Sequence, residues 1–151
     1  MPLEARAEVE VCASLDAAFE LFVQGFAQWW PRQYSWSGEH LVDIRIEPGL
    51  EGRLTETGPH GFTCDFGRVT AYGPPAGIAF LWQISPRREP VPDPSKASLV
   101  TVKFEESRGG TRVALRHTSF ENHGDGARDY AAAMGSEHGW PYILSCYAHA
   151  A

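Results

Sequence analysis

The chain has 151 residues, a length that suits one domain with a core large enough to fold without disulfides or a structural metal. Its formal net charge of −6 argues against a general nucleic-acid binder and against docking on anionic lipid, since both need a basic face. The N-terminus carries no signal-peptide core, no window reaches the roughly 18 apolar residues of a membrane span, and the three cysteines form no CxxC pair, so we expect a reduced, cytoplasmic protein without zinc.

The first predicted elements are a strand and two helices. Val9 and Val11 share one face of an alternating run, as they would in a strand. Ser14 can cap the helix that follows, Gly25 separates it from a shorter one, and Pro31 ends the second helix. The apolar residues of the two helices follow at steps of four, three and four and form one stripe: Leu15, Phe19, Phe22 and Phe26.

Alternating residues and short turns then predict about six antiparallel strands. Val42, Ile44 and Ile46 are expected on one face of the first of these strands. A longer strand is predicted from Phe62 to Tyr72, with Cys64 turned to the core on the face of Phe62 and Phe66. Gly67 interrupts this strand and indicates a bulge or a sharp bend.

The later strands carry large aromatic side chains. Phe80 and Trp82 share a face of one strand, and Phe104 takes the same face of the next. Between these strands, residues 86–95 contain four prolines and are predicted to form an exposed loop, with the arginine pair 87–88 in solvent.

The last strand and the C-terminal helix complete the pattern. Val113 and Leu115 point to the core in a straight strand, so His117 should point inward too. Pro141 is expected either in the first turn of a helix that begins near Gly139 or at a kink. The apolar stripe of that helix follows at i, i+3, i+4 and i+7: Trp140, Ile143, Leu144 and Tyr147.

The order of elements predicts an α+β fold of the helix-grip kind, with residues 1–151 in a single domain. A curved antiparallel sheet of six to seven strands would wrap around a long C-terminal helix, and two short helices would follow the first strand.

Several short motifs in a fixed order resemble one known family. They are residues 11–22, Trp29-Trp30-Pro31, Ile46-Glu47-Pro48 with Gly52-Arg53, Phe66-Gly67-Arg68-Val69, Pro74-Pro75, Trp82, and Gly139-Trp140. From about Val9 to Tyr147 the chain resembles the bacterial branch of the SRPBCC (START/Bet v 1-like) superfamily related to the C-terminal domain of the Hsp90 ATPase activator. Pro141 departs from that pattern, and the turn 49–52 lacks the paired glycines often seen there. The resemblance implies a cavity between sheet and C-terminal helix.

The candidate pocket-lining residues are Phe66, Phe80, Trp82, Phe104, His117, Trp140 and Leu144, although plain core packing explains their pattern equally well. No catalytic residue, metal or cofactor is predicted. His117 is expected either to bond a fixed protein group or to anchor a ligand, with Glu121 or Asp125 as its nearest carboxylates in sequence. The spacing of His117, Glu121 and His123 fits no established metal-ligand pattern.

Three function classes remain open at this point. The first is binding of a small apolar or amphipathic ligand. The second is a chaperone-interacting module, although the eukaryotic activator carries a separate N-terminal domain for which this length has no room, so we expect no stimulation of an Hsp90 ATPase. The third is a cyclase-like or hydrolase-like enzyme, for which His117, Tyr130 and Tyr142 are the candidate polar groups. A homodimer is compatible with each class.

Overall fold

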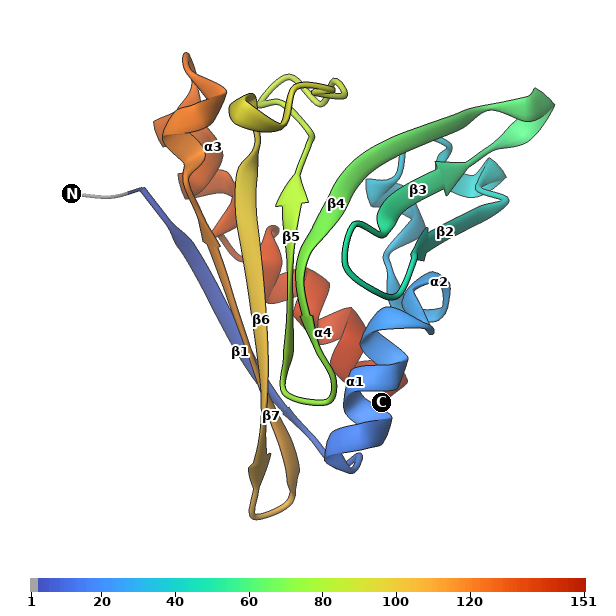
Figure 1. The fold of residues 1–151 in the computed structure, drawn as a ribbon, viewed down its shortest axis with the longest axis vertical. Helices are drawn as coiled ribbons and strands as arrows, with labels where there is room; N and C mark the ends of the chain where they lie inside the picture. Colours follow the sequence, from blue (N-terminus) through green and yellow to red (C-terminus); the bar gives the residue numbers. More distant parts are fainter. Residues whose placement is uncertain (1–2) are drawn as a thin grey trace.

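Seven antiparallel strands form one curved sheet in the computed structural model, which describes residues 3–151 (Figure 1). The strand order is β1-β7-β6-β5-β4-β3-β2. Strands β2 to β7 therefore lie side by side in chain order, and β1 pairs with β7 at the far edge. The strands are β1 (Ala5–Val11), β2 (Asp43–Ile46), β3 (Arg53–Thr57), β4 (Thr63–Gly73), β5 (Gly77–Trp82), β6 (Ser98–Ser107) and β7 (Gly110–Thr118).

The helices cover the concave face of this sheet. In Figure 1, α4 lies across the curve of the sheet, with α1 and α2 beside it. The helices are α1 (Leu15–Val23), α2 (Phe26–Trp29), α3 (Ala127–Met134) and α4 (Trp140–Ala150), and short 3₁₀ turns include η1 (Arg32–Tyr34), η2 (Gly38–His40), η3 (Pro59–Gly61) and η5 (Phe120–His123). The predicted helix-grip fold is confirmed. None of the described helices is long and apolar enough to cross a bilayer.

The helix boundaries follow the local chemistry that the sequence indicates. The Ser14 side chain accepts a hydrogen bond from the Ala17 amide at 3.2 Å and caps α1. Gly25 separates α1 from α2. Helix α4 begins after Gly139, so Pro141 lies in its first turn, where a missing amide proton costs nothing. Of the two alternatives for Pro141, the first-turn placement is therefore confirmed.

A β-bulge in β4 bends the sheet beside the cavity described below. Leu54 pairs with Gly67 and Thr55 pairs with Asp65, so Phe66 is the extra residue. A Cβ atom at position 67 would lie 2.6 Å from the carbonyl oxygen of Leu81, and only glycine allows β5 to approach this closely. The bulge predicted at Gly67 is confirmed, and it turns the Phe66 side chain into the interior.

Two residues expected in the core lie at the surface. Val42 precedes the edge strand β2 and its side chain is 66% exposed, whereas Ile44 and Ile46 are buried. Phe62 follows η3, before β4 begins, and is 40% exposed, while Cys64 is half-buried. The cause is the same in both regions. The tip of the β3–β4 hairpin projects away from the helices (Figure 1), and the edge strand β2 begins beside this tip, where Asp43 pairs with Thr57.

Candidate functional site

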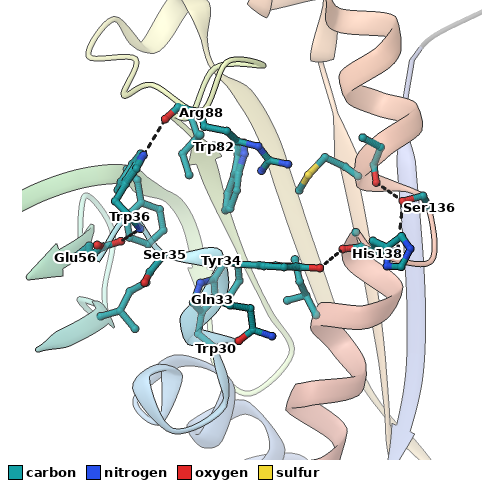
Figure 2. Close-up of a pocket in the computed structure, with 17 residues that line it drawn as sticks. Trp30, Gln33, Tyr34, Ser35, Trp36, Glu56, Trp82, Arg88, Ser136 and His138 are labelled. Atoms are coloured by element: carbon teal, nitrogen blue, oxygen red, sulfur yellow. Dashed lines mark hydrogen bonds between the residues drawn. The ribbon is translucent and has the colours of Figure 1, made fainter. Parts of the chain in front are cut away.

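A cavity of about 580 Å³ opens between the sheet and the segments that follow α2 and α3 (Figure 2). This volume lies within the range of small-molecule sites in proteins. Strands β2 to β5 supply one wall, the segment after α2 supplies the second, and the α3–α4 turn supplies the third. The aromatic residues that line the cavity are Trp30, Tyr34, Trp36, Phe66 and Trp82.

The deep wall of the cavity is a set of edge-to-face aromatic contacts. The rings of Phe66 and Trp82 are 6.1 Å apart at 80°, and the rings of Trp36 and Phe66 are 6.3 Å apart at 76°. Phe66 and Trp82 are each 2% exposed, whereas Trp36 is 37% exposed. The site therefore has a rigid aromatic floor and an aromatic rim in contact with solvent.

Hydrogen bonds fix the orientation of Trp82. Its Nε1–H donates to the Tyr130 hydroxyl at 2.7 Å, and that hydroxyl donates to the carbonyl oxygen of Ile84 at 2.8 Å. Burial raises the pKa of Tyr130 to about 12, so the phenol stays protonated and can make both bonds at neutral pH. The indole of Trp82 consequently presents a fixed surface to the cavity.

Glu56 is a buried carboxylate in the cavity wall, only 1% exposed. It stands on β3 two residues after Leu54, on the inward face. Its Oε1 accepts the amide of Trp36 at 3.0 Å, and its Oε2 accepts both the amide and the hydroxyl of Ser37, at 2.8 and 2.7 Å. These bonds tie the segment after α2 to the sheet.

Residues 33–37, called the strap below, cross the cavity and are bonded on each side. The Tyr34 hydroxyl donates to the carbonyl oxygen of His138 at 2.8 Å, and Trp36 Nε1–H donates to that of Arg88 at 2.8 Å (Figure 2). Gln33 Nε2 donates to the Tyr142 hydroxyl at 2.8 Å. The strap therefore links β3, the β5–β6 loop and the α3–α4 region around the cavity.

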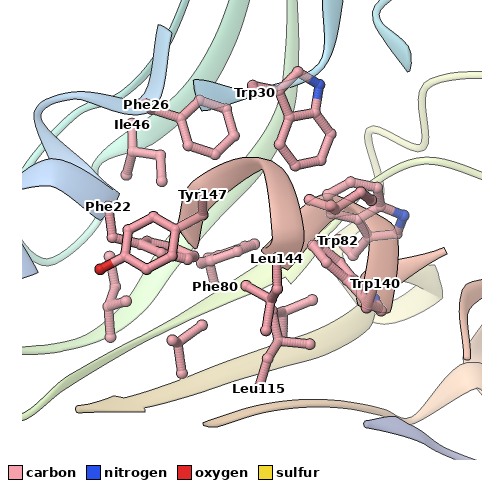
Figure 3. Close-up of a cluster of buried hydrophobic side chains, with 14 of the residues drawn as sticks. Phe22, Phe26, Trp30, Ile46, Phe80, Trp82, Leu115, Trp140, Leu144 and Tyr147 are labelled. Atoms are coloured by element: carbon pink, nitrogen blue, oxygen red, sulfur yellow. The ribbon is translucent and has the colours of Figure 1, made fainter. Parts of the chain in front are cut away.

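Two of the seven predicted pocket residues, Phe66 and Trp82, line this cavity. The others are buried in the packed interior, where Figure 3 shows Phe80, Trp140 and Leu144. Phe104, for example, packs edge-on against Phe19 and Phe22, with ring centroids 5.1 and 5.6 Å apart. The residues outside the cavity lining are Phe80, Phe104, His117, Trp140 and Leu144.

His117 points inward, as predicted, and is completely buried. Trp140 Nε1–H can only donate, so His117 Nδ1 accepts from it at 2.9 Å. His117 Nε2 therefore carries the proton and donates to Ser98 Oγ at 2.6 Å, and the Ser98 hydroxyl donates to His123 Nε2 at 2.8 Å. Burial, reinforced by the neighbouring His123, lowers the pKa of His117 to about 3.

Of the two roles expected for His117, these bonds match the first, a hydrogen bond to a fixed protein group. Its partners are Ser98 and Trp140, both fixed protein groups, and neither Glu121 nor Asp125 bonds to it in the described structure. Burial also lowers the pKa of His123. Of the other polar candidates, Tyr130 accepts the hydrogen bond of the Trp82 indole, as described above. Tyr142 bonds Gln33 of the strap.

The sequence interpretation missed the strap, Glu56 and Arg88. A charged residue on the inward face of a strand, two positions after the buried Leu54, was the available signal for Glu56. The strap consists of the end of η1 and the loop that follows, and it has no periodicity, so its path could not be predicted. Arg88 is exposed, as predicted for the arginine pair, and it also lines the cavity, where its carbonyl oxygen accepts the hydrogen bond of the Trp36 indole.

A curved antiparallel sheet packed against a C-terminal helix is the fold of the START/Bet v 1-like class of proteins. Within that class, residues 13–146 match the family described as Activator of Hsp90 ATPase homolog 1-like protein, and the chain belongs to this family. The resemblance inferred from the motifs is therefore confirmed. A search among curated proteins finds no match.

Solved structures share the fold of this chain. The chain is 31% identical to an anthrahydroquino-gama-pyrone synthase, Txn09, complexed with SUM, covering 100% of this chain and 97% of that one with a TM-score of 0.69. Protein NE0264 from Nitrosomonas europaea is 14% identical, with 97% and 92% coverage and a TM-score of 0.69. The Aha1 dimer from Colwellia psychrerythraea is 14% identical, with 97% and 94% coverage and a TM-score of 0.66. The last two show the fold alone.

Proposed function

We propose that this protein binds a planar, fused-ring aromatic molecule in the cavity beneath the strap. The observation that carries the proposal is the aromatic lining, in which a fixed Trp82 and the bulge residue Phe66 face a space of about 580 Å³. Aromatic pairs contribute roughly 0.5–1.5 kcal/mol beyond the area that they bury. A rigid planar ligand also loses little conformational entropy when it binds a site that is already formed.

The comparison with the synthase supports the same ligand class. Its name describes an anthrahydroquinone joined to a γ-pyrone, which is a flat, oxygenated polycyclic system. The identity of 31% extends over this whole chain, so the residues that form the cavity lie within the compared region. The likeness to the synthase therefore favours an oxygenated polycyclic ligand within the broader class of small apolar or amphipathic ligands expected from the sequence.

Titration with 9,10-anthraquinone-2-carboxylate, followed by tryptophan fluorescence and calorimetry, tests the proposal. Phe66→Leu should weaken binding by about twofold to tenfold, because an aromatic contact with the probe is lost. Phe80→Leu is the matched control. Phe80 is also 2% exposed but does not line the cavity, so the affinity of this variant for the probe should equal that of the unmodified protein. Absence of saturable binding, or equal effects of the two substitutions, would contradict the proposal.

A second candidate function is ring closure of an aromatic substrate in the same cavity. The observations that favour it are the likeness to a synthase and the buried carboxylate of Glu56 in the wall. In the isomerisation of 2′-hydroxychalcone to flavanone, the phenol O–H bond and the π bond of the enone C=C break. A C–O bond forms at the β-carbon and the proton ends on the α-carbon, so no oxidant is needed. Glu56 would be the base.

The absorbance of 2′-hydroxychalcone measures this activity directly. We expect the protein to convert the probe faster than buffer alone, and Glu56→Gln to remove the excess rate. A rate equal to that of buffer would eliminate this candidate and leave the binding proposal intact.

A further inference from the structure

We infer that the cavity distinguishes the two ends of its ligand, with Glu56 accepting a hydrogen bond from a ligand hydroxyl and Arg88 pairing with an acidic group. The ligand class would then be a hydroxylated polycyclic aromatic acid. This inference rests on the proposed function and adds the polar groups that the aromatic lining alone does not specify.

The acceptor capacity of Glu56 is not fully used by the protein. An ionised carboxylate offers about four lone-pair sites, and Glu56 accepts three hydrogen bonds, two on Oε2 and one on Oε1. No cationic group of the described residues lies within 4 Å of it. Because Glu56 is 1% exposed and lines the cavity, a molecule inside the cavity is positioned to supply the remaining donor.

Arg88 supplies the opposite charge at the rim. Its Cζ lies 5.9 Å from the centre of the Tyr130 ring, and within the described part of the chain its guanidinium pairs with no carboxylate. Figure 2 shows its side chain extending over the cavity from the β5–β6 loop. The backbone of Arg88 has a φ of +66°, and its carbonyl oxygen accepts the hydrogen bond of the Trp36 indole. The strap therefore helps to fix the backbone from which the Arg88 side chain extends.

The other titratable groups in the lining are Tyr34 and His138. The Tyr34 hydroxyl donates to the carbonyl oxygen of His138, and the His138 side chain is 83% exposed, with its Nε2 3.6 Å from Glu137 Oε1. The cavity therefore has one buried anion and one rim cation. A ligand anion near Glu56 would face like-charge repulsion in a low-dielectric site, whereas a hydroxyl there gains a charge-assisted bond. An anion near Arg88 gains an ion pair, so donor and acid must lie at different ends of the ligand.

Three probes test this polarity on the unmodified protein: 9,10-anthraquinone-2-carboxylate, its 6-hydroxy derivative and the 2,6-dicarboxylate. The hydroxy acid should bind about tenfold more tightly than the simple acid, because it adds a bond to the carboxylate of Glu56. The dicarboxylate should bind at least about tenfold more weakly than the simple acid, since one carboxylate must approach Glu56.

Variants assign each preference to its residue. Arg88→Gln should reduce the preference for the 2-carboxylate over the neutral 2-carboxamide by about threefold to tenfold. Arg87→Gln is the matched control, because this adjacent exposed arginine does not line the cavity. Glu56→Gln should abolish the advantage of the 6-hydroxyl and leave the carboxylate preference unchanged, in protein whose melting transition shows that it is folded.

The outcomes separate this inference from the proposed function. If none of the probes binds, the proposed function fails. If the three probes bind with equal affinity and Phe66→Leu still weakens them, aromatic binding stands and the polar assignment is overturned. Should Glu56→Gln fail to fold, the order of the three probes on the unmodified protein still decides the assignment.

Discussion

Replacing His117 with Phe should change both the stability of the protein and the dependence of that stability on pH. The substitution removes the acceptor of Trp140 Nε1–H and leaves a buried donor unpaired, at a cost of roughly 1–3 kcal/mol of unfolding free energy at neutral pH. Because His117 does not line the cavity, affinity for 9,10-anthraquinone-2-carboxylate should stay the same.

The pH dependence follows from the neutral state of the imidazole. The pKa of His117 is about 3 in the folded protein, against 6.5 for an ordinary histidine, so the unfolded chain takes up a proton first as the pH falls. The stability that the neutral His117 imidazole contributes is therefore fully present above the pKa of the unfolded chain, and it is lost as the pH decreases from 6.5 toward 3. Between about pH 7.5 and about pH 5 this one residue accounts for roughly 2 kcal/mol of the loss.

Urea unfolding at several pH values measures this effect. The unmodified protein should lose about 2 kcal/mol more than His117→Phe between about pH 7.5 and about pH 5, so the difference between them should nearly disappear at the acid end. His40→Gln is the control, because the His40 side chain is 73% exposed and should not alter the pH profile. Parallel curves for the unmodified protein and His117→Phe would refute the buried neutral imidazole.

Two further substitutions test the supports of the cavity wall. Tyr130→Phe leaves the Trp82 Nε1–H without its acceptor. The substitution should lower the unfolding free energy by about 1–3 kcal/mol and broaden the tryptophan emission. An unchanged melting temperature would contradict the role of this bond. Gly67→Ala places a Cβ atom 2.6 Å from the Leu81 carbonyl oxygen. This substitution should destabilise the protein by at least about 1 kcal/mol and weaken probe binding. An unchanged melting temperature would show that stability does not require glycine at the bulge.

Much of the fold could be predicted because alternation and turn residues act locally. The inward direction of His117, the break at Gly25 and the bulge at Gly67 each follow from a few neighbouring residues. The errors at Val42 and Phe62 occurred where strands extend past the helices, since alternation assigns a side chain to a face of the sheet but does not say whether anything covers that face.

The cavity could be predicted only in part, for a related reason. Phe80 and Trp82 share one face of β5 and are each 2% exposed, yet only Trp82 lines the cavity. The difference depends on how far the helices fill the space above each residue, which is a property of the tertiary packing. The contributions of Glu56 and Arg88 depend in addition on the path of the strap, which no periodic pattern encodes.

The central claim is that the cavity beneath the strap binds a planar aromatic ligand, and a crystal structure of the protein with 9,10-anthraquinone-2-carboxylate tests it most directly. We expect the fused rings to lie against Trp82 and Phe66, with Tyr130 still bonded to the Trp82 indole. A probe bound elsewhere on the surface, or a cavity closed by the side chain of Trp36 under saturating probe, would contradict the account.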